Sequence, residues 1–104
     1  TWQLVAIQGF QMETLETLPT ISFNGAEQRI SGNTGCNGFG GEYALNAKAL
    51  SFSKIISTQR ACTVGMDTEN KYMSALRNIN GYVVKEGVLL LTQDGKTLLE
   101  FKKK

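Results

Sequence analysis

The chain has 104 residues, of which 41% are hydrophobic and 19% charged, and these values exclude a disordered or membrane-embedded chain. We expect one globular domain over residues 1–104. The formal charge of +2 gathers in residues 54–104, which hold nine Lys or Arg against five Asp or Glu. Three of these cations end the chain and the others are scattered, so no basic stripe indicates nucleic-acid binding.

The first third of the chain is predicted to form short strands separated by turns. The opening TWQLVAIQ places Trp2 and Leu4 on one face and Val5 and Ile7 on the other, which is typical of a strand buried on both sides. Farther along, TISF and EQRISGN are strand-like. The Asn-Gly dipeptide at residues 24–25 predicts a tight turn between them.

The glycine-rich stretch GNTGCNGFGGEY, residues 32–43, comes next and runs into more strand-like sequence. We expect EYALN and ALSF to form a hairpin across Asn46-Ala47-Lys48, with SKIIS following. Glycines in the stretch permit backbone angles and close approaches that side chains forbid. We therefore expect residues 32–43 to form a corner of the fold.

One helix is predicted at about residues 67–79. Asp67 or Thr68 is expected to cap its first amides, and Asn80-Gly81 to end it in left-handed conformation. An isolated helix of this length is marginal in water, so its apolar face must pack on the strands. That face is formed at helical spacing by Tyr72, Met73, Leu76 and Ile79.

The strands GYVVKE, VLLLTQ and TLLEFK close the chain, separated by turns at Glu86-Gly87 and Asp94-Gly95. The sequence thus predicts a mainly β, α+β fold of about eight short antiparallel strands. We expect them to form a curved sheet or incomplete barrel, closed by the helix near residues 67–79.

Most catalytic chemistry is excluded by the absence of histidine, the usual general base and commonest metal ligand. Two cysteines without histidine cannot build a four-ligand zinc site, and we expect neither a metal nor a cofactor. Gly95-Lys96-Thr97 resembles the end of a phosphate-binding loop, but it lies between two strands. A Cys36 or Thr58 nucleophile, activated by Lys54 or Arg60, is the remote enzymatic alternative.

The two cysteines occupy irregular segments at the ends of strands. Cys36 lies in the glycine-rich stretch and Cys62 just before the helix, so the two chain segments can approach within disulfide distance. A bridge would close a loop of about 25 residues and stabilise the fold by about 3 kcal/mol. Two buried free thiols are the alternative. We favour the disulfide, together with an oxidising compartment.

The strings GNTGCNGFGGEY, STQRAC and ENKYMSAL, preceded by Trp2-Gln3-Leu4, resemble the META domain family, which includes HslJ-like heat-shock proteins. The match runs from Trp2 to Phe101. The resemblance implies a domain of the bacterial cell envelope, in lipoproteins or secreted proteins, with a stress-related role. It implies no enzymatic activity and carries over only signature positions, namely Gly35, Cys36, Asn37, Gly41, Tyr43, Thr58 and Cys62.

The leading hypothesis is a non-enzymatic envelope domain, periplasmic, outer-membrane-associated or secreted, that binds an apolar small molecule or an envelope protein. A lipid anchor upstream of Thr1 would fit this hypothesis, because the chain itself has no transmembrane segment. The expected cavity residues, which could instead simply fill the core, are Phe23, Phe39, Tyr72, Leu76 and Leu90. The alternative is a scaffold or interaction module of a longer secreted protein or lipoprotein, with Phe39 either contacting a partner or plugging the loop.

Overall fold

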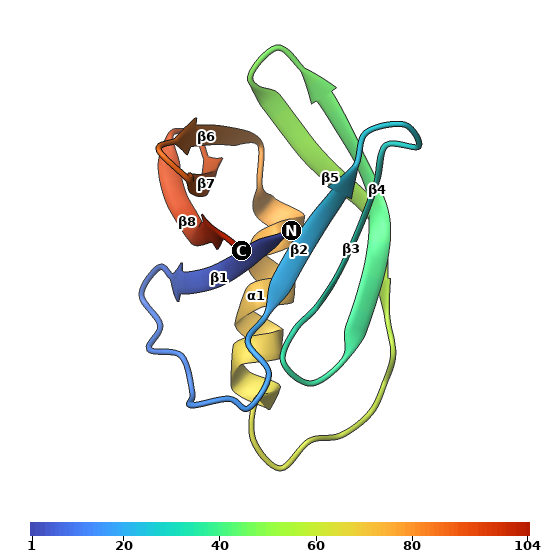
Figure 1. The fold of residues 1–104 in the computed structure, drawn as a ribbon, viewed down its shortest axis with the longest axis vertical. Coiled ribbons are helices and arrows are strands. Elements are labelled where there is room, and N and C mark those ends of the chain that lie inside the picture. The colour runs from blue at the N-terminus through green and yellow to red at the C-terminus, as the bar shows by residue number, and fades with distance from the viewer.

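The computed structural model describes all residues from 1 to 104 and contains eight strands and one helix (Figure 1). Each strand pairs antiparallel with the next and β8 returns to β1, so the strands close a ring. The prediction of a mainly β fold with a single helix, α1 (Met66–Asn78), is confirmed. The strands are β1 (Trp2–Ile7), β2 (Thr20–Asn24), β3 (Arg29–Asn33), β4 (Gly38–Asn46), β5 (Ala49–Ser57), β6 (Gly81–Lys85), β7 (Val88–Gln93) and β8 (Lys96–Lys103).

The ring consists of two four-stranded sheets joined by two short seams. One sheet runs from β2 to β5, and the other contains β6, β7, β8 and β1. At one seam β1 and β2 share two residue pairs, and at the other β5 and β6 share only the pair Ala49 and Gly81. Figure 1 shows the β4–β5 hairpin standing apart from β6, with α1 between the two sheets.

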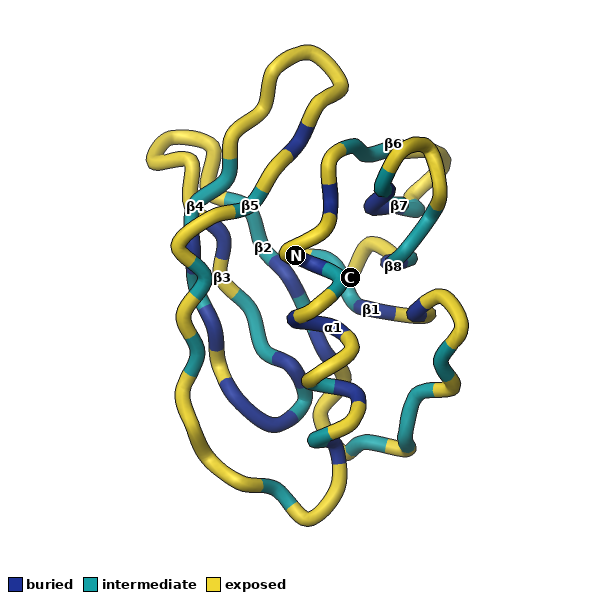
Figure 2. The backbone as a smooth tube through the Cα atoms, turned by 180° about the vertical axis from the view of Figure 1, so that it is seen from behind, coloured by how far each residue is buried: buried dark blue, intermediate teal, exposed yellow.

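The apolar face of α1 fills the interior of the ring. Tyr72 and Leu76 are fully buried, and the Tyr72 ring lies edge-on to Phe39 at a centroid distance of 5.6 Å. The Tyr72 hydroxyl donates a hydrogen bond of 3.0 Å to the carbonyl oxygen of Thr20. Every element except β6 contributes a buried side chain to the core. In Figure 2 these inward stretches are dark blue, whereas the β4–β5 tip and the connection from β5 to α1 are largely exposed.

Strand β1 differs from its prediction. A bulge between Leu4 and Ala6 shifts its register with β8, so Leu4 and Ile7 are both buried although they are three residues apart. Val5 is 40% exposed. The expectation of burial on both faces was wrong, because strict alternation holds only for a regular strand.

The two ends of α1 also differ from their predictions. Gly65, at a φ of 107°, is the N-cap residue, and neither Asp67 nor Thr68 caps the helix with its side chain. The helix ends at an extended Ile79, and Gly81 is not left-handed. Gly81 is needed for close packing instead, because a Cβ there would lie 2.9 Å from the side-chain oxygen of Thr92.

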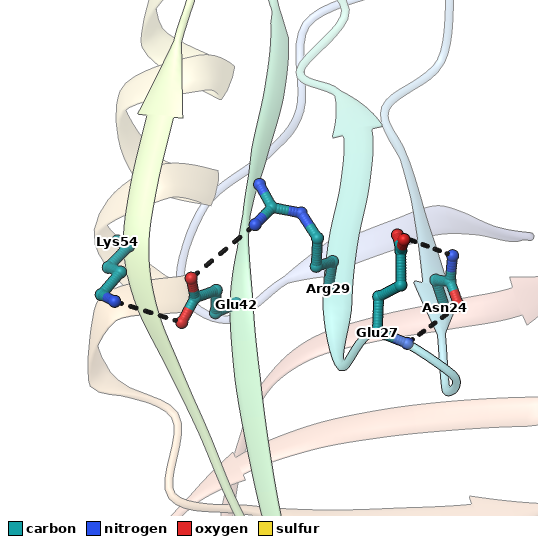
Figure 3. Close-up of polar contacts among 5 residues, drawn as sticks. All are labelled: Asn24, Glu27, Arg29, Glu42 and Lys54. Atoms are coloured by element: carbon teal, nitrogen blue, oxygen red, sulfur yellow. Dashed lines mark hydrogen bonds and ion pairs between the residues drawn. The ribbon is translucent and has the colours of Figure 1, made fainter.

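The turns on either side of β7 form as predicted. Glu86 and Gly87 have φ values of 50° and 78°, and Asp94 and Gly95 have 52° and 82°, as two-residue hairpin turns require. The connection from β2 to β3 is longer than predicted. There the Asn24 side chain accepts a hydrogen bond from the amide of Glu27 (Figure 3) and a second from the amide of Ala26. The left-handed residue of this connection is Gln28 (φ 54°).

The outer face of the first sheet carries the only ion pairs of the chain. Glu42 lies 3.7 Å from Arg29 and 3.5 Å from Lys54, joining β3, β4 and β5 (Figure 3). All three side chains are exposed, so each pair contributes little to stability. The one helix is too short and too polar to cross a membrane.

Burial raises the pKa of Tyr72 well above its ordinary value. The packing of Tyr72 can therefore be tested by measuring stability at alkaline pH. Because the folded state holds the neutral phenol, its stability contribution is complete below the unfolded pKa of about 10 and is lost as the pH rises beyond it. The Tyr72→Phe variant should lose about 1 kcal/mol at pH 7 with the Thr20 hydrogen bond. Above pH 10 its stability should fall less steeply than that of the wild type, as measured by denaturant titration. Equal slopes would contradict a buried Tyr72.

Candidate functional site

The glycine-rich stretch forms the corner between β3 and β4. The Thr34 hydroxyl accepts hydrogen bonds from the amides of Cys36 (3.2 Å) and Asn37 (2.9 Å), and this turns the chain within four residues. Gly35 has a φ of 93°, and a Cβ there would lie 2.8 Å from the Leu15 side chain. Glycine is therefore required at residue 35 both by its backbone angle and by its packing.

Asn37 holds this corner against two other segments. Its side-chain oxygen accepts hydrogen bonds of 2.8 Å from the Thr58 hydroxyl and from the Arg60 amide. Its side-chain nitrogen donates 2.9 Å hydrogen bonds to the Arg60 carbonyl and to the Glu69 carboxylate, which also accepts a 2.7 Å bond from Thr34. The Asn37 amide is 3% exposed, so this network replaces the water that the amide loses.

A disulfide between Cys36 and Cys62, with their Cα atoms 6.0 Å apart, closes the same corner. The disulfide prediction is confirmed, and no free thiol remains. The proposed Cys36 nucleophile is therefore contradicted, because the attacking species would have to be a thiolate. Of its proposed activators, Lys54 lies on the outer face with Glu42, and Arg60 donates a 2.7 Å bond to the Cys36 carbonyl.

The signature positions thus lie in two places. Gly35, Cys36, Asn37, Thr58 and Cys62 lie at the corner, where a disulfide joins the two cysteines and the Thr58 hydroxyl donates to Asn37. Tyr43 lies farther along β4, with its ring edge-on to Phe23 at 5.3 Å. Between the two places a Cβ at Gly41 would lie 3.0 Å from the carbonyl oxygen of Ser53, so this glycine allows β4 and β5 to approach closely.

The predicted cavity residues do not line one cavity. Phe39, at 6% exposure, packs with Tyr72 and Leu76 in the solid core, because α1 occupies the space that the ring encloses. Leu90 points away from the interior, since its neighbours Leu89 and Leu91 are buried whereas Leu90 is partly exposed. Phe39 borders a shallow surface hollow beside Gly40 and Ile56. Phe23 borders a different hollow, whose lining is entirely hydrophobic.

That hollow, which we call the apolar cleft, has a volume of about 210 Å³ and lies between the two sheets. Its lining contains no charged residue and no residue of α1. Leu45 and Val84 remain 49% and 55% exposed, so the cleft is open to solvent beside them. The lining residues are Trp2, Phe23, Tyr43, Leu45, Leu50, Tyr82, Val84 and Leu89.

The apolar cleft exists because the seam between β5 and β6 ends almost at once. Beyond Ala49 and Gly81 the two strands diverge, and the helix packs elsewhere in the ring. The sequence held a partial signal for this site. Leu45 and Leu50 flank a hairpin turn where polar residues are usual, and Tyr82 alternates with Val84 on β6.

A family model described as META domain matches residues 1–104. Among solved structures, an NMR structure of a protein from Burkholderia xenovorans shares 26% identity with a TM-score of 0.76, covering 99% of this chain and 80% of its own. A second NMR structure shares 24% identity with a TM-score of 0.73, covering 97% of this chain and 86% of its own.

A third solved structure is similar in fold alone. This crystal structure of a DUF4847 family protein from Bacteroides vulgatus shares 20% identity with a TM-score of 0.66 and covers 81% of this chain and 57% of its own. No curated protein sequence matches the chain.

The role of Phe39 can be tested by replacing it with alanine. Because its ring is buried against Tyr72, the Phe39→Ala variant should lose about 3–5 kcal/mol in the free energy of unfolding. Ile56→Ala is the control, since Ile56 is 73% exposed and its loss should change stability by less than about 0.5 kcal/mol. Denaturant unfolding measures both variants. Unchanged stability of Phe39→Ala would indicate a contact residue instead of a plug.

Proposed function

The chain belongs to the META domain family, and on this premise we propose that residues 1–104 form a single non-enzymatic binding domain of the bacterial cell envelope. Its apolar cleft binds an apolar segment of a ligand or of a protein partner. The observation that carries the proposal is an open hollow lined by eight hydrophobic residues and by no charge. Exposed apolar surface of this kind is typical of binding sites.

The size of the cleft limits what it can hold. Pockets that enclose a drug-sized ligand measure about 300–1,000 Å³, whereas this cleft measures about 210 Å³. It therefore accommodates an alkyl or aromatic segment, while the rest of the bound molecule stays outside. Four of the lining residues are aromatic and offer flat, rigid contact surfaces, namely Trp2, Phe23, Tyr43 and Tyr82.

A non-enzymatic role is supported by the use of the polar groups at the corner. The Thr58 hydroxyl, the Asn37 amide and the Glu69 carboxylate are hydrogen-bonded within the fold. The chain has no histidine that could act as a base beside them. These polar groups therefore hold chain segments together.

An envelope location is supported by the Cys36–Cys62 disulfide, because such bonds persist in oxidising compartments. We propose a periplasmic, outer-membrane-associated or secreted protein, with a lipid anchor as one means of attachment. A stress-related role rests on the resemblance to the HslJ-like proteins.

The free edge of β6 favours the second candidate function, an interaction module. Lys85 pairs with Val88 across a two-residue turn, so alternation turns the backbone N–H and C=O of Val84 away from β7. No strand pairs with β6 on that side beyond Gly81. An extended partner segment could add there and place an apolar side chain in the cleft.

Ligand binding is tested with the uncharged fluorescent probe N-phenyl-1-naphthylamine. Val84→Asp should weaken its binding at least about tenfold, because a bound probe would desolvate the new carboxylate. Val83→Asp is the matched control, since Val83 is 46% exposed on the opposite face of the same strand. Probe fluorescence and emission of Trp2, the only tryptophan, measure binding. Equal affinities of the two variants would contradict binding in the cleft.

The interaction module is distinguished by comparing Val84→Pro with Val84→Ala. Proline removes the outward N–H of residue 84, which an added partner strand would use, but breaks no bond to β7. A partner that adds to β6 should bind Val84→Ala and not Val84→Pro, while both variants should bind the probe alike. Pull-down of a candidate partner measures this difference, and equal capture by both variants would contradict strand addition.

A further inference from the structure

A strap of residues 8–19 joins β1 to β2 and passes beside the start of α1 (Figure 1). The Glu13 carboxylate on this strap accepts hydrogen bonds from the Gly65 amide (2.9 Å) and the Thr68 amide (3.0 Å). It also accepts a 2.9 Å hydrogen bond from the Thr68 hydroxyl. Glu13 therefore takes the place of the N-terminal cap that Asp67 or Thr68 was expected to supply.

The strap also covers the two glycines that bracket the disulfide. A Cβ at Gly35, just before Cys36, would lie 2.8 Å from one Leu15 methyl, and a Cβ at Gly65 would lie 3.1 Å from the other. The Gly65 position is also 4.0 Å from the Cβ of Cys36. Leu15 therefore packs over the Cys36 side of the bridge, where Cys36 is 3% exposed, whereas Cys62 is partly exposed.

Residues 11–18 are held by few other contacts. No backbone–backbone hydrogen bond involves them, and Glu13 makes their only hydrogen bonds to the rest of the molecule. Backbone hydrogen bonds resume at Gln8 with Leu98 and at Pro19 with Leu4. Met12 and Leu15 of this segment pack against the rest of the molecule but are only partly buried. A segment with a single hydrogen-bonded residue between two fixed ends is expected to open without unfolding the ring.

We propose that residues 11–18 are a cover over the Cys36 side of the Cys36–Cys62 disulfide, fastened by Glu13, and that reductants reach the Cys36 sulfur when this cover opens locally. Reduction adds two electrons and two protons to the bridge and gives two thiols. The electrons come from the external reductant, for which a water-soluble phosphine serves as the probe. The phosphine attacks one sulfur and breaks the S–S bond, and one water molecule then supplies the oxygen of the phosphine oxide and the two protons of the thiols. None of these steps depends on what the apolar cleft binds.

The charged side chains near Glu13 contact other groups and form no ion pair with Glu13. Arg60 bonds to the Cys36 carbonyl, Glu69 bonds to Thr34 and Asn37, and Lys71 lies over the Phe10 ring. Glu16 on the strap and Asp67 on the helix make no ion pair, and none reaches Glu13. Glu13 is thus held by the backbone and hydroxyl hydrogens at the start of α1.

The fastening has a defined pH dependence. The hydrogen bonds from the amides of Gly65 and Thr68 lower the pKa of Glu13. Because the folded state favours the carboxylate, the fastening is complete above the unfolded pKa of about 4.3 and weakens as the pH falls below it. The Glu13 fastening is therefore complete at neutral pH and weaker in acid.

The test measures how fast tris(2-carboxyethyl)phosphine reduces the bridge. The thiols that form are alkylated, and the alkylated protein is quantified by mass spectrometry. At pH 7 Glu13→Gln should be reduced roughly tenfold faster than the wild type, because one acceptor oxygen becomes an amide that faces the N–H donors. Glu16→Gln is the matched control on the same strap and should be reduced at the wild-type rate. The Glu13→Gln to wild-type rate ratio should fall towards one below pH 4.

Leu15→Ala is the second variant, because it removes the packing over Gly35 and Gly65 but keeps the Glu13 carboxylate. It should also accelerate reduction. Amide hydrogen exchange should quicken at Gly65 and Thr68 in Glu13→Gln, with unchanged exchange at the core residues Leu91 and Leu99. Equal reduction rates for Glu13→Gln and Glu16→Gln would overturn the proposal. So would core exchange that rises in step with reduction, because the reductant would then enter by global unfolding.

Discussion

The fold depends on the packing of one helical face inside a ring that its strands close poorly. The β5–β6 seam has a single residue pair, so backbone hydrogen bonds contribute little to holding the two sheets together there. Tyr72 and Leu76 of α1 fill the space between the sheets with fully buried side chains. Apolar burial therefore supplies the cohesion that the strand ladder lacks at this seam.

Both ends of α1 are fixed by contacts distant in sequence. At its start, Glu69 joins the network of Asn37 at the corner, and the disulfide ties the preceding connection to the same corner. After its end, Asn80 bonds to Thr92 on one sheet and to Leu50 on the other. The polar corner thus sets where the helix enters the ring, and the seam sets where it leaves. The region beside the seam that the helix does not fill is the apolar cleft.

Most features that could be predicted from the sequence are encoded by neighbouring residues, and the Cys36–Cys62 disulfide is the exception because the chain has only two cysteines. The turns at Glu86-Gly87 and Asp94-Gly95 and the apolar face of α1 depend on local spacing alone. The helix cap could not be predicted from the residues around the helix start, because Glu13, which accepts the hydrogen bond from the Gly65 amide, lies 52 residues away in the sequence. The same limit applies to the site, since Trp2 and Val84 line one cleft only after the ring has closed.

Ring closure also determines when the chain can fold. The first strand forms most of its ladder with the last, so β1 has no complete partner until residues 96–103 are available. During synthesis this partner is missing until residues 96–103 have left the ribosome, and contacts so distant in sequence form slowly. Completion of the ring then brings residues 1 and 104 together, where the Lys104 amide donates to the Thr1 carbonyl.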